Sequence, residues 1–143
     1  MKKKVLIITA SYYLTITESL RADAETLLNN SKIKFDVIDV PGVFEIPVTI
    51  AKNIKKYDGF IALGCVIKGA TPHFDFISKT TFEGLMKLSI ENKKPIGNGI
   101  ITSLNLQQAI QRSGVGEDLL EKRKNKGKGK EATKAVISVL SQK

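Results

Sequence analysis

The chain has 143 residues, 42% of them hydrophobic and 26% charged, which predicts one soluble globular domain over residues 1–143. A single cysteine, Cys65, excludes an intrachain disulfide and fits a reducing compartment such as the cytoplasm. One cysteine and one histidine also argue against a metal site, and no apolar stretch approaches membrane-spanning length.

The net charge of +9 is distributed unevenly along the chain. Residues 1–121 have a net charge of +2, whereas residues 122–143 have a net charge of +7, concentrated in the segment 122–130. A basic face of the kind that binds nucleic acid is therefore not expected, so neither a nucleic acid nor a membrane is predicted as a partner. A local basic loop is expected instead.

Predicted strands and helices alternate along the chain. The residues 1–4 precede an apolar run that is too short for a secretory signal and predicts a buried strand. Apolar runs predict strands at 5–10, 60–67 and 95–102, and alternation predicts a fourth strand at 35–40. Apolar side chains at helical spacing predict helices at 15–28, 46–54, 72–91, 106–112 and 131–141.

Strands that are almost entirely apolar are typical of a parallel sheet that helices cover on both faces. The predicted fold is therefore a flavodoxin-like three-layer α/β/α sandwich with about four parallel strands. Ligands of such sheets bind beyond the carboxyl ends of the strands, which here indicates the loops at 11–15, 41–45, 68–73 and 102–105.

The segment 64–75 is the most informative of these strand ends. It predicts a buried strand that stops at a glycine, then a turn, and then a helix that Thr71 caps, with Pro72 at the first helical position. Free amides at such a turn attract phosphate, and the positive helix end favours a neutral His73 that can accept or donate a proton. A surface or capping histidine at an ordinary strand–helix junction remains the alternative.

Other side chains at these strand ends also allow two interpretations. Tyr12 suits either packing or surface placement, or stacking on a planar ligand. Glu45 can complement a helix dipole or accept hydrogen bonds from ligand hydroxyls, and Arg112 can complement a dipole or bind phosphate. The sequence contains no P-loop, no dinucleotide-binding glycine motif and no nucleophile elbow.

Four groups of residues, at 41–47, 64–75, 97–112 and 125–127, together resemble the lumazine synthase family over nearly the whole chain. The resemblance implies a transferase that condenses 5-amino-6-(D-ribitylamino)uracil with 3,4-dihydroxy-2-butanone 4-phosphate. Phosphate and water leave, and the product is 6,7-dimethyl-8-ribityllumazine, a precursor of riboflavin. It also implies that no cofactor and no metal is needed, and that the chain forms pentamers whose active sites lie between neighbouring subunits.

The resemblance further implies a role for each matching residue. His73 matches the proton-transfer histidine, and Glu45 matches the carboxylate that binds the ribityl hydroxyls. The phosphate is expected to bind the turn Gly69, Ala70 and Thr71 together with Arg112. The remaining substrate-binding matches are Tyr12, which stacks on the pyrimidine, Val43 and Phe44 through their backbone, Cys65, Val66 and Ile67 at the end of the third strand, and Asn98 and Lys126 from an adjacent subunit.

Four departures from the family pattern matter. Tyr12 stands where Phe or Trp is usual, and Ser11 and Tyr13 replace an Arg and an Asn, which leaves the role of Tyr13 open. Lys68 stands where Arg is frequent. The extra length at 116–124 predicts an isolated pentamer or a pair of pentamers, rather than a capsid.

Two alternatives to an enzyme are a carrier of flavin-like ligands and a nucleic-acid-binding protein that uses the basic loop. Basic charge beside the predicted phosphate site favours the handling of a phosphorylated substrate instead.

Overall fold

A computed structural model describes residues 2–69, 72–114 and 127–143 of the chain. The strands are β1 (Lys4–Ala10), β2 (Lys34–Val40), β3 (Gly59–Ile67) and β4 (Ile96–Ser103). The helices are α1 (Leu14–Asn30), α2 (Ile46–Asn53), α3 (His73–Asn92), α4 (Leu106–Ser113) and α5 (Lys128–Leu140). All the predicted strands and helices are confirmed, with ends that differ by a few residues. Two short 3-10 turns, η1 (Ser11–Tyr13) and η2 (Val43–Glu45), were not predicted.

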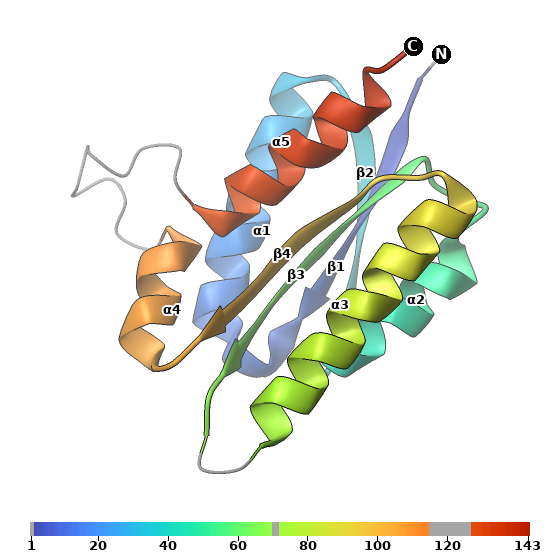
Figure 1. Cartoon of the computed structure of the whole chain (residues 1–143). Coiled ribbons are helices and arrows are strands. Elements are labelled where there is room, and N and C mark those ends of the chain that lie inside the picture. The colour runs from blue at the N-terminus through green and yellow to red at the C-terminus, as the bar shows by residue number, and fades with distance from the viewer. Residues whose placement is uncertain (1, 70–71, 115–126) are drawn as a thin grey trace.

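The four strands form one parallel sheet in the order β2-β1-β3-β4. Helices α2 and α3 cover one face, and α1 and α5 cover the other, with α4 beside them (Figure 1). This arrangement confirms the flavodoxin-like three-layer sandwich. None of the described helices is long and apolar enough to cross a membrane.

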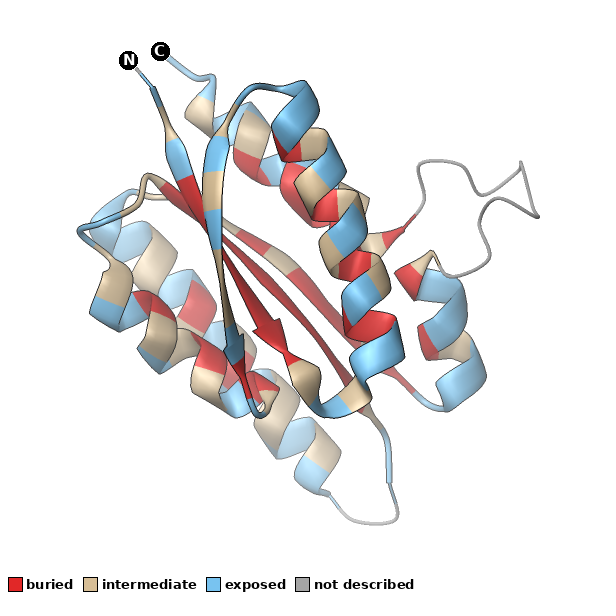
Figure 2. Ribbon diagram, turned by 180° about the vertical axis from the view of Figure 1, so that it is seen from behind, coloured by how far each residue is buried: buried red, intermediate tan, exposed pale blue. Residues whose placement is uncertain are grey.

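Alternation along β1 divides the core into two layers. Val5 and Ile7 pack in the cluster under α1 and α5, whereas Leu6 and Ile8 pack in the cluster under α2 and α3, and all four are fully buried. Figure 2 shows this burial along the central strands, while β2 at the sheet edge is largely open. Each fully buried Leu or Ile contributes about 1.5–3 kcal/mol to folding, which explains why uninterrupted apolar runs become the central strands.

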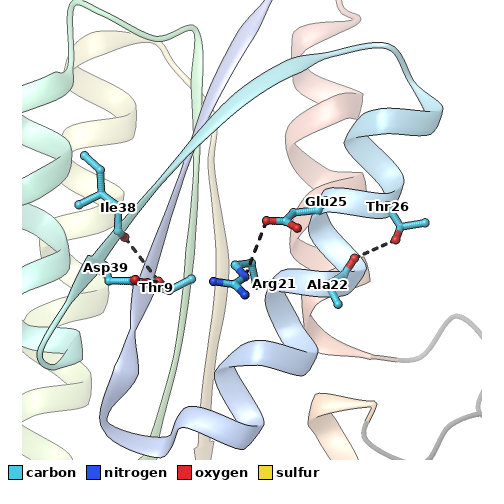
Figure 3. A network of polar contacts seen from close by, with 7 residues as sticks. All are labelled: Thr9, Arg21, Ala22, Glu25, Thr26, Ile38 and Asp39. Atoms are coloured by element: carbon cyan, nitrogen blue, oxygen red, sulfur yellow. Dashed lines mark hydrogen bonds and ion pairs between the residues drawn. The ribbon is translucent and has the colours of Figure 1, made fainter.

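A polar network holds the carboxyl ends of β1 and β2 together (Figure 3). The hydroxyl of Thr9 donates to the carboxylate of Asp39, and the hydroxyl of Thr17 donates to the carbonyl of Ala10 at 2.8 Å. Thr9 and Thr17 are both buried, so these bonds satisfy hydroxyls that would otherwise be costly to bury. The network thereby fixes the point at which η1 leaves the sheet.

Close contact between β4 and α5 depends on Gly97. A Cβ atom built on Gly97 would lie 2.5 Å from the carbonyl oxygen of Ala132 and 2.8 Å from a methyl group of Val136. Both partners belong to α5, so a side chain at this position would force α5 away from the sheet.

Candidate active site

A cleft of about 360 Å³ lies beyond the carboxyl ends of β1 and β3. This is the edge of the sheet where ligands of parallel α/β folds bind. Seven of the residues predicted to bind substrate or transfer protons line this cleft: Tyr12, Val43, Phe44, Cys65, Val66, Ile67 and His73. Tyr13 lines it as well.

His73 is the first residue of α3 and is exposed at the mouth of the cleft. The carbonyl of Pro72 accepts hydrogen bonds from the amides of Asp75 at 3.1 Å and Phe76 at 3.3 Å, so Pro72 occupies the N-cap position. The prediction that Pro72 is the first helical residue is therefore wrong by one position. The predicted cap Thr71, and Ala70 beside it, lie outside the described residues.

Turn η1 presents two tyrosine rings to the cleft. Tyr12 is 78% exposed, so it does not pack in the core; it lies at the surface, where its ring is open to a stacking partner. The ring of Tyr13 meets it edge to face, with centroids 4.9 Å apart and planes at 80°. Burial, followed by the proximity of Cys65 and Tyr12, raises the pKa of Tyr13. Tyr13 therefore stays a neutral phenol that supports the ring of Tyr12.

The end of β3 supplies an apolar wall of the cleft. Cys65 and Val66 are buried and Ile67 is partly buried. Burial raises the pKa of the Cys65 thiol to about 11, so this side chain is an uncharged, unreactive part of the wall. Gly69, just beyond the strand, is exposed, and a Cβ atom there would meet nothing within 4 Å. The backbone at Gly69 is therefore accessible, although Gly69 does not line the cleft itself.

Glu45 lies beside the cleft rather than in it. Its Oε1 atom accepts a hydrogen bond from the amide of Gly42 at 3.0 Å, which is the structural role expected of a carboxylate at a helix start. Glu45 lines a neighbouring groove of about 440 Å³ between α2 and α3, and Phe44 lines both the groove and the cleft. A carboxylate accepts more than one hydrogen bond, so its capacity for ligand hydroxyls is not exhausted.

Asn98 and Arg112 line a separate hollow of about 310 Å³. There both side chains form hydrogen bonds with backbone groups of β4, the strand at the free edge of the sheet. The Oδ1 atom of Asn98 accepts from the amide of Ile100 at 3.0 Å, and Nη1 of Arg112 donates to the carbonyl of Thr102 at 2.5 Å. Within one chain, Arg112 therefore does not line the cleft that holds His73. Lys126, the remaining predicted contact, lies outside the described residues.

Among the described residues, no group of three or more histidine, cysteine, aspartate or glutamate side chains could hold a metal ion. The cleft has a planar ring, an apolar wall and a histidine at the first position of a helix. Such a combination suits a planar heterocycle that carries or meets a phosphorylated group.

These features define an α/β protein with a small-molecule cleft at the carboxyl edge of a parallel sheet. The family model described as 6,7-dimethyl-8-ribityllumazine synthase matches residues 2–143, and the chain belongs to this family. Its similarity to a 6,7-dimethyl-8-ribityllumazine synthase from Beijerinckia indica is 42% identity over 116 residues, which is 78% of this chain and 64% of that protein. The corresponding protein of Bartonella tribocorum is 38% identical over 148 residues, covering 100% of this chain and 93% of the relative. That of Agrobacterium fabrum is 37% identical over 149 residues, covering 99% and 95%.

Proposed function

We propose that the chain is a transferase of riboflavin biosynthesis that condenses 5-amino-6-(D-ribitylamino)uracil with 3,4-dihydroxy-2-butanone 4-phosphate to form 6,7-dimethyl-8-ribityllumazine. The observation that carries the proposal is the position of the only histidine. His73 lies in one cleft with the open ring of Tyr12 and the apolar end of β3. The choice of reaction is based on family membership, and the residues of the cleft are chemically suited to that reaction.

In this proposal, the pyrimidine stacks on Tyr12, with Val66 and Ile67 against its edge. The ribityl chain extends past Phe44, which joins the cleft to the groove of Glu45. The primary amine of the pyrimidine attacks the ketone of the second substrate and forms an imine, with loss of one water. Elimination of phosphate then leaves an enol, which becomes a ketone, and the nitrogen that carries the ribityl chain attacks this carbonyl and closes the second ring with loss of a second water. His73 moves protons in imine formation and in the departure of phosphate.

Phosphate leaves toward the turn that begins at Gly69, where amides at the start of α3 favour an anion. Most of the acceleration comes from holding the two substrates in contact, because correct alignment alone can lower a barrier by about 7–11 kcal/mol. The chemistry requires neither a cofactor nor a metal, and the low reactivity of Cys65 leaves it no covalent role.

Arg112 and Asn98 then serve a cleft of a second copy. Their hollow is separate from the cleft of their own chain, while the groove between α2 and α3 carries exposed apolar side chains that a second copy would cover. Phe44 and Val48 are the exposed apolar side chains that line the groove, and α3 carries three more, Phe76, Met86 and Ile90, outside it. We infer a cytoplasmic homo-oligomer, a pentamer or a pair of pentamers, whose sites lie between copies. The preference for pentamers over a capsid depends on the segment 116–124, which lies outside the described residues. Light scattering that shows a megadalton shell would contradict this preference.

The direct test mixes the two substrates with the protein and follows lumazine fluorescence. Wild-type protein is expected to form product, and His73→Ala is expected to slow turnover by about tenfold to a hundredfold with pyrimidine binding unchanged. The modest loss follows because alignment survives the substitution. Tight binding of the pyrimidine by wild-type protein without condensation would indicate a carrier instead. Weakened pyrimidine binding in His73→Ala at an unchanged chemical rate would show that His73 is a binding residue.

A second experiment tests the division of the site between copies. His73→Ala and Arg112→Ala proteins are mixed after dissociation and reassembled. If each site takes His73 from one copy and Arg112 from the next, about one site in four regains both residues and activity reappears. Absence of any recovery in reassembled oligomers would mean that both residues act within one chain.

A further inference from the structure

Lysines gather at the amino edge of the sheet, opposite the cleft. Parallel strands all begin at this edge, and both chain termini lie there too (Figure 1). Five short segments, at 2–4, 32–34, 55–58, 93–95 and 141–143, hold ten lysines and a single acidic residue, Asp58. The rest of the described chain holds nine basic and ten acidic residues. We call these five segments the lysine pole.

The segments of the lysine pole are in contact with one another. Lys4 of β1 lies directly opposite Lys34 of β2 in the sheet register. Lys2, Lys3 and Lys32 line one hollow of about 490 Å³ together with Ser141 near the C-terminus. The fold therefore brings together lysines that are far apart in the sequence. Along the sequence these lysines are interspersed with acidic residues, so the net charge of residues 1–121 is only +2 and does not show the cluster.

Little of this charge is neutralised locally. Among the described residues, Lys4 is the one lysine of the pole in an ion pair, with Asp36 at 3.1 Å. Asp58 accepts a hydrogen bond from the amide of Lys4 at 2.9 Å, and Lys94 donates to the carbonyl of Ile54 at 2.6 Å. Eight of the ten lysines are exposed. The pole therefore presents a positive field to solvent.

Favourable interaction with helix dipoles explains only part of the arrangement. Lys32 and Lys93 follow the C-terminal ends of α1 and α3, where a cation is favoured. Both, however, occupy left-handed backbone positions, at φ 58° and 54°, that glycine fills at lower cost. Lys2 and Lys3 line a hollow with Leu140, the last residue of α5, so a helix end is near them as well, whereas Lys34 is the first residue of β2.

We propose that the lysine pole binds the phosphodiester backbone of a nucleic acid, without reading its bases. Lysine is a point charge suited to phosphate, and the pole contains no arginine that could bind a base edge with two hydrogen bonds. None of the large exposed apolar side chains of the described residues belongs to its five segments, so the surface lacks the anchors that insert into a membrane.

The dimensions of the pole agree with this partner. Four strands about 4.8 Å apart, with a helical layer about 10 Å away on each face, give a surface of roughly 15 by 30 Å. One turn of duplex DNA is about 34 Å long and presents a phosphate about every 1.7 Å along its axis. The binding is independent of the proposed catalysis, because the pole and the cleft lie at opposite edges of the sheet.

The test measures fluorescence polarisation of a labelled duplex of roughly 20 base pairs with the full chain, between about 50 and 200 mM salt. About four phosphate contacts would give a slope of log K against log salt concentration near −4. The charge-reversed variant Lys32→Glu/Lys34→Glu is expected to bind at least about tenfold more weakly with a shallower slope. The matched control Lys79→Glu/Lys134→Glu has the same change in net charge on exposed faces of α3 and α5, and is expected to lose less than about threefold. Lumazine formation should be unchanged in the variant of the pole.

Three results would overturn the proposal. Equal weakening in both charge-reversed variants would show that net charge alone attracts the duplex. If wild-type protein does not bind the duplex at about 50 mM salt, a nucleic acid is not the partner. The same conclusion holds if the protein binds phosphatidylserine vesicles but not the duplex. If circular dichroism shows that the charge-reversed variant of the pole does not fold, the variant Lys32→Gln/Lys34→Gln is used in its place. Its salt-dependence slope is expected to decrease by about half as much as that of the charge-reversed variant.

Discussion

Substituting Gly97 by alanine should destabilise the fold and disturb one half of the proposed site. The new Cβ atom would lie 2.5 Å from the carbonyl oxygen of Ala132, which is part of the α5 backbone and cannot rotate away. Helix α5 must therefore move outward from β4 by several tenths of an ångström. Overpacking of this kind costs about 1–3 kcal/mol, which for a chain of this length lowers the melting temperature by about 2–10 °C.

The displaced helix also carries residues of the hollow around Asn98 and Arg112. Lys128 and Glu131 of α5 line that hollow, so their movement should raise the KM of the phosphorylated substrate. Residues of α5 do not line the cleft of His73, so binding of the pyrimidine should be unaffected.

The assay is urea unfolding at a fixed protein concentration, with Gly84→Ala as the matched control. Gly84 lies inside α3, where a Cβ atom would make only ordinary contacts with Pro47 at 3.4 and 3.5 Å. Alanine there should therefore stabilise the helix by about 0.5–1 kcal/mol. If Gly97→Ala unfolds at the same urea concentration as wild-type protein, or is more stable, the contact between β4 and α5 is not as close as described.

Three further substitutions test other parts of the structure. Arg112→Lys should raise the KM of the phosphorylated substrate by about tenfold or more and leave the affinity for the pyrimidine similar. The reason is that an ammonium group, unlike a planar guanidinium, cannot bind the carbonyl of Thr102 and a phosphate in one plane. Unchanged steady-state kinetics would contradict this. The phenol of Tyr57 donates to Asp36 at 2.6 Å, which raises the pKa of Tyr57 to about 12 and lowers that of Asp36. The stabilisation from this hydrogen bond should be complete below pH 10 and disappear as the pH rises toward 12. Tyr57→Phe should therefore reduce the loss of stability between pH 10 and pH 12. The same loss in the variant and in wild-type protein would refute the role of this bond. Lys93→Gly should stabilise the chain by about 0.5–1 kcal/mol in thermal unfolding, since glycine adopts φ 54° without strain, and a lower melting temperature would count against that reasoning.

The sequence predicted the fold well because its signals are local. Each central strand is an unbroken apolar run, and Ile46 and Ile50 recur at the spacing of one helix face, so strand and helix were distinguished by period alone. The turns η1 and η2 escaped prediction because three residues are too few to show a period. The start of α3 was misplaced by one residue, because the local sequence defines a helix end only to within one or two residues.

The site was predicted in its residues but not in its arrangement. Tyr12 and His73 meet in one cleft because both follow carboxyl ends of neighbouring parallel strands, β1 and β3, and that rule is visible in the sequence. The separate placement of Arg112 was not visible, because it depends on how α4 packs beside the free edge of β4. The lysine pole escaped for the same reason, since only the sheet topology brings its five segments together.

The most direct test of the central claim is a crystal structure of the assembled protein with the lumazine product and inorganic phosphate bound. The product ring is expected against Tyr12 in the cleft of one copy, with His73 of that copy beside it. Phosphate is expected between the start of α3 and Arg112 of a neighbouring copy. A product ring bound outside the cleft, or a phosphate held without any contribution from a second copy, would contradict the account.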